Sequence, residues 1–168
     1  RENGFAAALR LNGLGYARFS GKAKPSDIRG LQRELGGWMK GLPKPVGIFA
    51  ANDIMAAQVA AAAIRTKLNI PEDVAVVGVD NDELLCENTK PTLSSVMPDF
   101  RAAGEKAAAM LAERMANPKM RPASETFGPL RLVRRTSSNR TKRIDREVLA
   151  EIPALRASLE HNIETYHF

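Results

Sequence analysis

The sequence contains one cysteine, two histidines and no long apolar run. Because Cys86 has no partner for an intrachain disulfide, and no Cys/His cluster has the spacing of a zinc site, we expect a reducing compartment, namely the cytoplasm. No apolar run reaches the roughly 18 residues that a membrane-spanning helix needs, which excludes membrane insertion. The chain also opens on Arg1 rather than on methionine, in a stretch already typical of a helix, so we infer a piece of a longer protein.

The motifs of common enzyme classes are missing as well. The sequence has no Gly-x-Ser-x-Gly, no glycine-rich phosphate loop and no metal-binding pair. Asp80, Asp82 and Glu83 could in principle act as acid and base, but no partner on another strand completes such a site. We therefore predict a protein that is not an enzyme and that uses no cofactor or metal. An α/β enzyme completed by a residue outside this chain is the third-ranked alternative.

The composition is that of a globular protein with a basic balance. At 168 residues and 44% hydrophobic content, the chain can bury one substantial core or two lobes that share segments. The net charge of +6 favours a polyanionic partner. We expect the positive excess late in the chain, where a stretch without acids contains Arg131, Arg134, Arg135, Arg140, Lys142 and Arg143.

Two apolar runs separated by an alanine-rich segment dominate the pattern. Residues 46–51 and 74–79 read as buried strands, and residues 53–67 read as the helix between them. A strand, helix and strand in this order form a right-handed unit with parallel strands. Asn52-Asp53 and Asp80-Asn81-Asp82 then lie at the carboxyl ends of neighbouring strands, which is where open α/β sheets bind small ligands.

The remaining elements are predicted from periodicity and from capping residues. Residues 84–89 show no clear pattern. The expected elements are a helix over 4–13, a strand over 14–19, a helix from 28 capped by Ser26 or Asp27 and ending before Pro43, a strand or crossing segment over 91–96, an amphipathic helix over 100–115 capped by Asp99, an edge strand over 129–136, and a helix over 147–164 interrupted by Pro153.

Five blocks of this sequence, taken in order, resemble the sugar-sensing domain of the LacI-type transcriptional regulators. Within that group, the segment around Trp38 and the segment Asp145-Arg-Glu-Val look most similar to the xylose-operon regulators, in which a sensor precedes an AraC-type DNA-binding domain. The blocks are Arg1-x-x-Gly-Phe, Ile48-Phe-Ala-Ala-Asn-Asp-Ile-Met-Ala, Ile70-Pro-Glu-Asp-Val-Ala-Val-Val-Gly-Val-Asp-Asn-Asp-Glu, Pro91-Thr-Leu-Ser-Ser-Val-x-x-Asp-Phe and Leu132-Val-Arg-Arg-Thr-Ser.

The resemblance implies an α/β fold of the periplasmic-binding-protein-like type I, with a parallel sheet covered by helices on both faces. One lobe would be nearly complete and a segment of the other would be present. Residues 1–90 would form the second lobe, 91–128 a return segment that belongs to the first lobe, 129–137 the final strand, and 138–168 a linker and the truncated start of a helical DNA-binding region. The helix over 100–115 would then lack its partner strands.

The resemblance also implies ligand contacts for Arg1, Asn52, Asp53 and Asp80. Carboxylates and amides suit a neutral sugar, because each sugar hydroxyl both donates and accepts hydrogen bonds. We therefore expect a monosaccharide effector, with xylose or another pentose favoured. The alternative is structural: Asn52-Asp53 would only cap a helix, with Asp53 the better candidate for the cap, residues 80–82 would only form a turn, and Arg1 would be loose.

The implied partners follow from the same resemblance. Operator DNA would be bound through a domain absent from this chain, and the alanine-rich helix would pair two copies in a homodimer. The alternative function is that of a periplasmic-type sugar-binding protein that passes its ligand to a transporter. A signal peptide or a DNA-binding domain in the full-length protein would separate the two functions.

Overall fold

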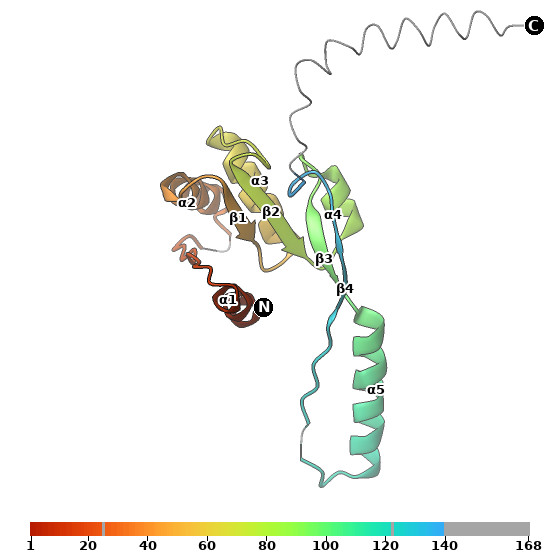
Figure 1. The fold of residues 1–168 in the computed structure, drawn as a ribbon. Helices are drawn as coiled ribbons and strands as arrows, with labels where there is room; N and C mark the ends of the chain where they lie inside the picture. Colours follow the sequence, from red (N-terminus) through yellow and green to blue (C-terminus); the bar gives the residue numbers. More distant parts are fainter. Residues whose placement is uncertain (25, 122, 140–168) are drawn as a thin grey trace, which may run out of the picture.

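A computed structural model describes residues 1–24, 26–121 and 123–139 of the chain (Figure 1). The linker and the helix predicted beyond residue 139 lie outside the described residues. No helix in the described ranges is both long and apolar enough to cross a membrane.

One four-stranded sheet runs through the molecule in the order β1-β2-β3-β4. Val46 of β1 pairs with Val74 of β2, and Val77 of β2 pairs with Ser94 of β3, both in parallel, whereas β4 is antiparallel to β3. The parallel unit and the edge position of the last strand are therefore confirmed. The strands are β1 (Val46–Phe49), β2 (Val74–Val79), β3 (Ser94–Pro98) and β4 (Pro129–Val133).

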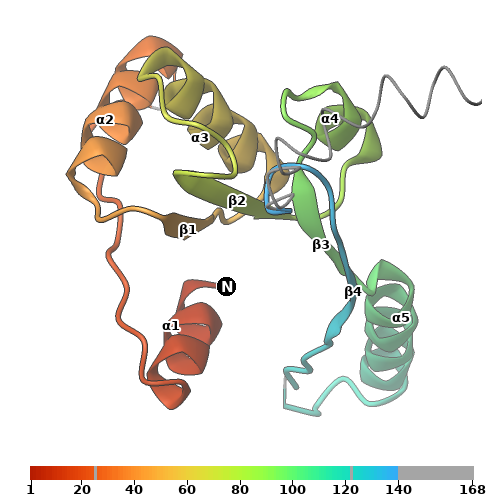
Figure 2. The same cartoon turned by 45° about the horizontal axis from the view of Figure 1, so that its top comes forward.

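Helices cover the two faces of the sheet unequally. α2 and α3 lie together on one side of β1 and β2, and α1 lies on the other side (Figure 2). α4 follows β2, and α5 extends from the end of β3 away from α2 and α3 (Figure 1). The helices are α1 (Glu2–Leu11), α2 (Ile28–Gly41), α3 (Asp53–Arg65), α4 (Glu83–Asn88) and α5 (Phe100–Ala116).

Four of these helices begin at an acidic or amide side chain that accepts a hydrogen bond from the backbone N–H three residues later. This bond satisfies one of the free N–H groups at a helix start and fixes where the helix begins. The capping pairs are Asp27 with Gly30, Asn52 with Met55, Asp82 with Leu85, and Asp99 with Ala102. The caps predicted at Asp27 and Asp99 are confirmed.

The core lies between the sheet and the pair α2–α3. Met39 of α2, Val76 of β2 and Ala60 of α3 are fully buried in it. The small side chains of α3 let the helix approach closely, and a Cβ on Gly36 of α2 would lie 2.5 Å from Cγ2 of Thr66. This core holds β1 and β2 rigidly side by side.

α1 is anchored to the sheet by its first turn. The Phe5 ring stacks on the Phe49 ring of β1, with centroids 4.8 Å apart and 14° between the ring planes. Stacked aromatic pairs of this kind contribute roughly 0.5–1.5 kcal/mol beyond their buried area. The stack brings the start of the chain to the carboxyl ends of the central strands.

Two elements differ from the sequence prediction. Residues 14–19 form no strand and run as a mostly exposed connection, in which Phe19 packs against Trp38 with ring centroids 5.4 Å apart. The six residues of α4 were missed because only Cys86 among them is buried, so no helical period is visible. Their signal is the cap at Asp82.

α5 has no buried residue, and its apolar side chains are exposed, Leu111 by 61% and Met115 by 73%. It is tied to the connection that follows it, since Lys106 pairs with Glu125 at 2.9 Å. The structure does not pack α5 on the α2–α3 pair (Figure 1). Its apolar stripe therefore stays uncovered in the described part of the chain.

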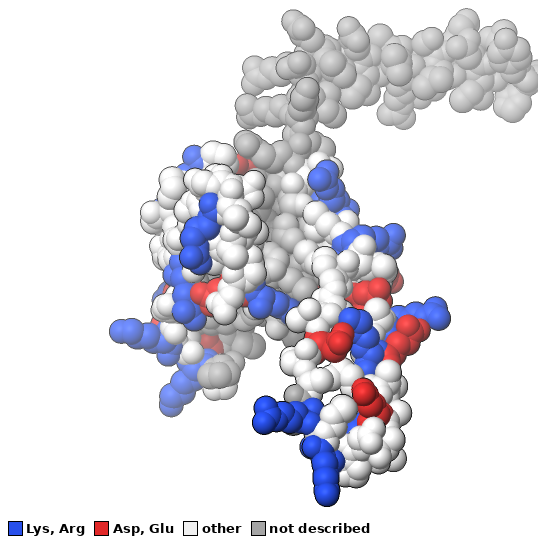
Figure 3. Space-filling view, turned by 60° about the horizontal axis from the view of Figure 1, so that its bottom comes forward, with Lys and Arg blue, Asp and Glu red and all other residues white. Residues whose placement is uncertain are grey.

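Positive charge is concentrated both late in the chain, as expected, and early in it, since residues 131–143 contain six Lys and Arg and no Asp or Glu. Residues 1–45 contain nine Lys and Arg against three Asp and Glu, which equals the whole net charge of +6. Figure 3 shows acidic and basic side chains interleaved over the part of the surface formed by α5. Asp and Glu outnumber Lys and Arg in residues 46–130 and in residues 144–168, and these two segments together offset the charge of residues 131–143.

Candidate functional site

The carboxyl ends of β1 and β2 form a common rim that is joined by Arg1. Its Nη2 donates to Oδ1 of Asp80 at 2.6 Å, and its Nη1 donates to the backbone carbonyl of Ala51. Ala51 is the second residue after the end of β1, and Asp80 is the first residue after the end of β2. Asn52 and Asp80 thus follow neighbouring parallel strands at the same edge of the sheet, as the strand pattern predicted. Arg1, which only the resemblance placed there, bonds to both strand ends.

The ion pair between Arg1 and Asp80 is open to solvent. The Arg1 side chain is 45% exposed and the Asp80 side chain is 36% exposed. Pairs with this exposure contribute little to folding stability. Both groups therefore remain accessible for hydrogen bonds with a molecule bound at the rim.

The Asn52 side chain caps α3 through its oxygen and leaves its amide nitrogen available. Its Oδ1 accepts the Met55 N–H at 2.8 Å and caps α3, so Asn52 is the cap residue, and the prediction that Asp53 is the better cap was wrong. Within the described ranges, the Asn52 Nδ2 group has no hydrogen-bond partner. The amide is thus fixed by the cap while its two N–H donors stay available.

Asp53 lies behind the rim rather than on it. Its side chain is buried, with the residue 2% exposed, and both carboxylate oxygens are used within the chain. Oδ1 accepts the Ser95 hydroxyl at 2.6 Å, and Oδ2 accepts the Asp82 N–H at 2.8 Å. Gly78 makes room for this carboxylate, because a Cβ there would lie 2.2 Å from Asp53 Oδ1. A ligand contact for Asp53 stays a prediction.

The loop after β2 has an unusual backbone. Asp80 has a φ of 107° and Asn81 a φ of 52°, in the left-handed region that residues with a side chain rarely adopt. Two side chains hold the loop: Ser95 Oγ accepts the Asn81 N–H at 3.1 Å, and the Arg135 guanidinium donates to Asn81 Oδ1 at 3.0 Å. The position of the Asp80 carboxylate depends on this arrangement.

Ser95 and Arg135 were not among the predicted site residues. Arg135 had been counted only as part of a charged segment. The available signal was the pair of serines, Ser94 and Ser95, at the start of a buried strand, where a hydroxyl needs an internal partner.

Cys86 packs behind the same loop. Burial, with a smaller effect of the nearby Asp53 carboxylate, raises the pKa of the Cys86 thiol from 9.0 to about 12. The pKa of the thiol is therefore higher in the folded chain than in the unfolded chain, where the thiol ionises more readily. The protonated thiol stabilises the folded state fully below pH 9, and this stabilisation is lost as the pH rises towards 12.

We expect Cys86→Ala to lose less stability than the wild-type chain when the pH is raised from about 8 to about 10.5. Lysine and tyrosine titrations are common to both proteins and cancel in the comparison. Urea unfolding at the two pH values measures the difference. Parallel losses of stability in the two proteins would contradict the assigned environment of the thiol.

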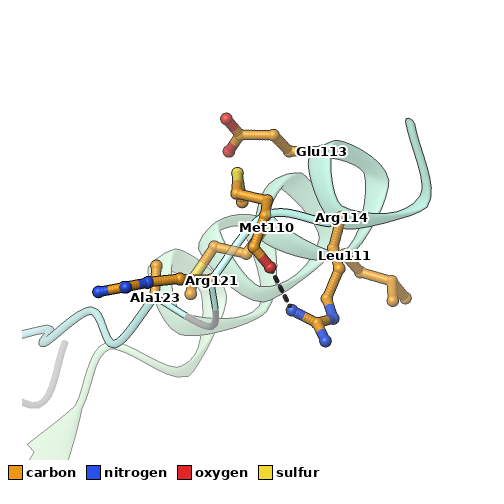
Figure 4. A pocket seen from close by; sticks show the side chains of 7 residues that line it. Met110, Leu111, Glu113, Arg114, Arg121 and Ala123 are labelled. Atoms are coloured by element: carbon orange, nitrogen blue, oxygen red, sulfur yellow. Dashed lines mark hydrogen bonds between the residues drawn. The ribbon is translucent and has the colours of Figure 1, made fainter. Parts of the chain in front are cut away.

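The described surface also has two shallow hollows, and none of the predicted site residues lines either of them. One, of about 270 Å³, lies between residues 19–22 and Trp38. The other, of about 190 Å³, lies at the far end of α5, where Arg114 donates to the Met120 carbonyl (Figure 4). Neither hollow contains a set of converging polar groups comparable to the rim. The second hollow is lined by Met110, Leu111, Glu113, Arg114, Met120, Arg121 and Ala123.

Comparison with protein families gives a match over most of the chain. The family model described as a periplasmic binding protein-like domain matches residues 1–138. The xylose operon regulatory protein of Haemophilus influenzae is 30% identical over 133 residues, which are 79% of this chain and 34% of that protein. The protein of the same name in Escherichia coli K12 is 27% identical over 132 residues, 79% of this chain and 34% of that protein. The chain therefore spans about a third of the length of these relatives.

Solved structures show the same similarity. A xylose-binding transcription activator superposes with a TM-score of 0.67 at 26% identity, over 88% of this chain and 40% of that chain. A LacI family transcriptional regulator from Arthrobacter sp. FB24, solved in complex with lactose, superposes with a TM-score of 0.63 at 28% identity, over 82% of this chain and 50% of that chain.

Proposed function

The chain belongs to the family of periplasmic binding protein-like domains, and on that basis we propose that it forms part of the sugar-sensing domain of a transcriptional regulator. The family match confirms the fold class predicted from the sequence, and the relatives confirm the resemblance to LacI-type and xylose-operon regulators. The matched relatives are transcriptional regulators, in agreement with the prediction that the chain is not an enzyme.

The observation that supports this proposal is the meeting of Arg1, Asn52 and Asp80 on one rim. Asp80 offers carboxylate acceptors, Asn52 offers amide donors, and Arg1 adds guanidinium donors beside them. Two neighbouring sugar hydroxyls can each donate to the carboxylate and accept from one of the nitrogen groups. Charge-assisted bonds of this kind are shorter and stronger than bonds between neutral groups.

We assign these three residues to a monosaccharide, and we favour a pentose. The relatives named for xylose support this choice, although a relative with comparable identity holds lactose. The rim supplies a few fixed polar groups, and a sugar that lacked a matching hydroxyl would lose its hydrogen bond to the Asp80 carboxylate. Selectivity among sugars would then come from which hydroxyls reach Asp80 and Asn52.

The further parts of the proposal concern partners. Operator DNA would be bound through a domain outside this chain, in the cytoplasm, and sugar binding would act on DNA only through a different affinity for two arrangements of the sensor. A homodimer would form through α3, where Ile54 is 65% exposed and Ile64 is 55% exposed beside small alanine side chains. Residues 91–128 would belong to the first lobe, and that lobe would contribute the opposite side of the sugar site.

A transport-type sugar-binding protein is the second candidate, and the family description favours it to the extent that it names periplasmic proteins. Both functions use the same rim. A regulator also has a DNA-binding domain, whereas a transport protein passes its sugar to a transporter. An electrophoretic mobility shift with the DNA upstream of the gene therefore separates the two functions. A sugar-dependent shift supports the regulator, and sugar binding without any shift supports the transport protein.

The test of the proposed function is a calorimetric titration of the full-length protein that contains residues 1–168 with a panel of pentoses and hexoses. We expect saturable heat for at least one monosaccharide, with D-xylose the first choice, and an unchanged sugar when the sample is analysed afterwards. Conversion of the sugar to a product would overturn the proposal. The absence of saturable binding over the whole panel would overturn it as well.

A further inference from the structure

We propose that Ser95 and Arg135 are positioning residues which, through Asp53 and Asn81, hold Asp80 in the conformation that binds the sugar. This inference rests on the proposed function, because Asp80 is the residue assigned to the ligand. The geometry that supports it is a continuous set of hydrogen bonds around the loop that follows β2. Asp53, Ser95, Asn81 and Arg135 each contribute at least one bond of 3.1 Å or less to that set.

The loop needs such support because its backbone is strained. A non-glycine residue held at positive φ costs roughly 1–3 kcal/mol when its surroundings impose that conformation. Asp80 and Asn81 are two such residues in succession. With weaker support, the loop would relax towards ordinary backbone angles and would turn the Asp80 carboxylate away from Arg1 and Asn52.

Ser95 supplies the support from β3. Its hydroxyl accepts the Asn81 N–H at 3.1 Å and donates to Asp53 Oδ1 at 2.6 Å, so one buried group serves both residues. The other oxygen of Asp53 accepts the Asp82 N–H at 2.8 Å. The backbone N–H groups of Asn81 and Asp82 therefore both donate to the pair Asp53–Ser95.

Arg135 supplies the support from the segment after β4. Its side chain is only 10% exposed, and its guanidinium donates to Asn81 Oδ1 at 3.0 Å and to the Leu93 carbonyl at 2.9 Å. The same guanidinium pairs with Glu87 of α4. A planar group with several donors can make these bonds at once, which a lysine ammonium on a flexible stem does less well.

Ser95 and Arg135 lie on the two chain segments that connect α5 to the sheet. Ser95 lies shortly before α5, and Arg135 lies shortly after the connection that returns from α5 through β4. Both chain segments that lead to α5 thus bond the loop that carries Asp80. Because coupling between two sites is reciprocal, a shift of the α5 segment that alters these bonds changes sugar affinity, and sugar binding favours one position of that segment.

The experiment compares three variants of the full-length protein by amide hydrogen exchange and by calorimetric titration with D-xylose. Ser95→Ala removes both hydroxyl bonds, and Ser95→Thr keeps the hydroxyl and serves as the rescue. Thr66→Val is the control, because it removes a hydroxyl bond to the Ala62 carbonyl at 2.8 Å, at the end of α3, without touching the loop. The Val77 amide in β2 is the internal reference for global opening.

For Ser95→Ala we expect the amides of Asn81 and Asp82 to exchange at least about tenfold faster relative to Val77, and the Kd for D-xylose to rise about tenfold, which corresponds to about 1.4 kcal/mol. Ser95→Thr and Thr66→Val should keep both values near those of the wild type. Equal acceleration at Val77 and at Asn81 in Ser95→Ala would show a general loss of stability and would overturn the inference. Unchanged exchange and affinity would overturn it too.

Arg135→Lys extends the test to the second residue. The charge is kept, but the bonds to Asn81 and Leu93 are not reproduced together, so we expect faster exchange at Asn81 and weaker D-xylose binding at nearly unchanged global stability. Wild-type affinity and exchange in this variant would remove Arg135 from the inference. If the wild-type protein binds no sugar, the proposed function fails, while the exchange results still decide whether Ser95 and Arg135 hold the loop.

Discussion

Asp80→Ala is expected to weaken sugar binding about a hundredfold while the protein stays folded. The Asp80 carboxylate is 36% exposed, and its partner Arg1 is 45% exposed, so its removal leaves no buried group unpaired. Each hydrogen bond to a charged group contributes about 1.5–3 kcal/mol, and two such bonds to sugar hydroxyls correspond to a hundredfold or more in Kd. Calorimetric titration with the best sugar of the panel measures the change.

The matched control for this prediction is Glu72→Gln. Glu72 is an exposed carboxylate in the turn before β2, so the variant loses one negative charge close to the same strand but at its opposite end. We expect its sugar affinity to equal that of the wild type. If Asp80→Ala and Glu72→Gln bind sugar equally well, Asp80 does not contact the ligand and the assigned rim is wrong.

Gly78→Ala is expected to lower the free energy of unfolding by about 2 kcal/mol. The new Cβ would lie 2.2 Å from Asp53 Oδ1 and 3.2 Å from Asp53 Cα, so the carboxylate and the start of α3 would both have to move. Neither group is a flexible chain end, because the carboxylate is fixed by Ser95 and by the Asp82 N–H. Urea unfolding of the two proteins measures the difference.

Gly47→Ala, in the neighbouring parallel strand, is the control for Gly78→Ala. A Cβ on Gly47 meets no atom within 4 Å, and its position in β1 is exposed. Alanine restricts the unfolded chain more than glycine does, so we expect unchanged or slightly higher stability. A Gly78→Ala protein as stable as Gly47→Ala would contradict the close approach of Asp53 to β2.

The elements that surround the rim could be predicted because their sequence signals are local. The apolar runs of β1 and β2 and the alanine-rich α3 define a parallel unit, and the polar residues that follow each strand must then meet at one edge. The placement of Asn52 and Asp80 follows from that topology alone. The position of Arg1 came from the resemblance, and the structure ties it to the rim through Asp80.

The network behind the rim could not be predicted, because its bonds join residues far apart in sequence. Asp53 and Ser95 are 42 residues apart, and Asn81 and Arg135 are 54 residues apart. Each of these residues has an ordinary local explanation as a cap, a strand serine, a turn residue or a surface charge. Gly78 leaves the space in which the Asp53 carboxylate reaches Ser95, and a glycine in a buried strand was the trace of that packing in the sequence.

The strand expected over residues 14–19 failed for a related reason. Strand propensity describes how well side chains fit a half-buried pleated surface, and this segment is exposed except at Phe19. In the described part of the chain, β1 is an edge strand that pairs only with β2. The positive charge of residues 1–45 is less visible in the sequence than that of residues 131–143, because it is dispersed over α1, the connection and α2 rather than concentrated in one run.

The most direct test of the central claim is a two-dimensional amide NMR titration of the protein with its best monosaccharide. We expect the resonances of Asn52 and its side-chain amide to shift together with those of Asp80, Asn81 and Asp82, with one common midpoint. Saturable shifts confined to another surface, such as the hollow at the end of α5, would contradict it. So would shifts on only one of the two strand ends.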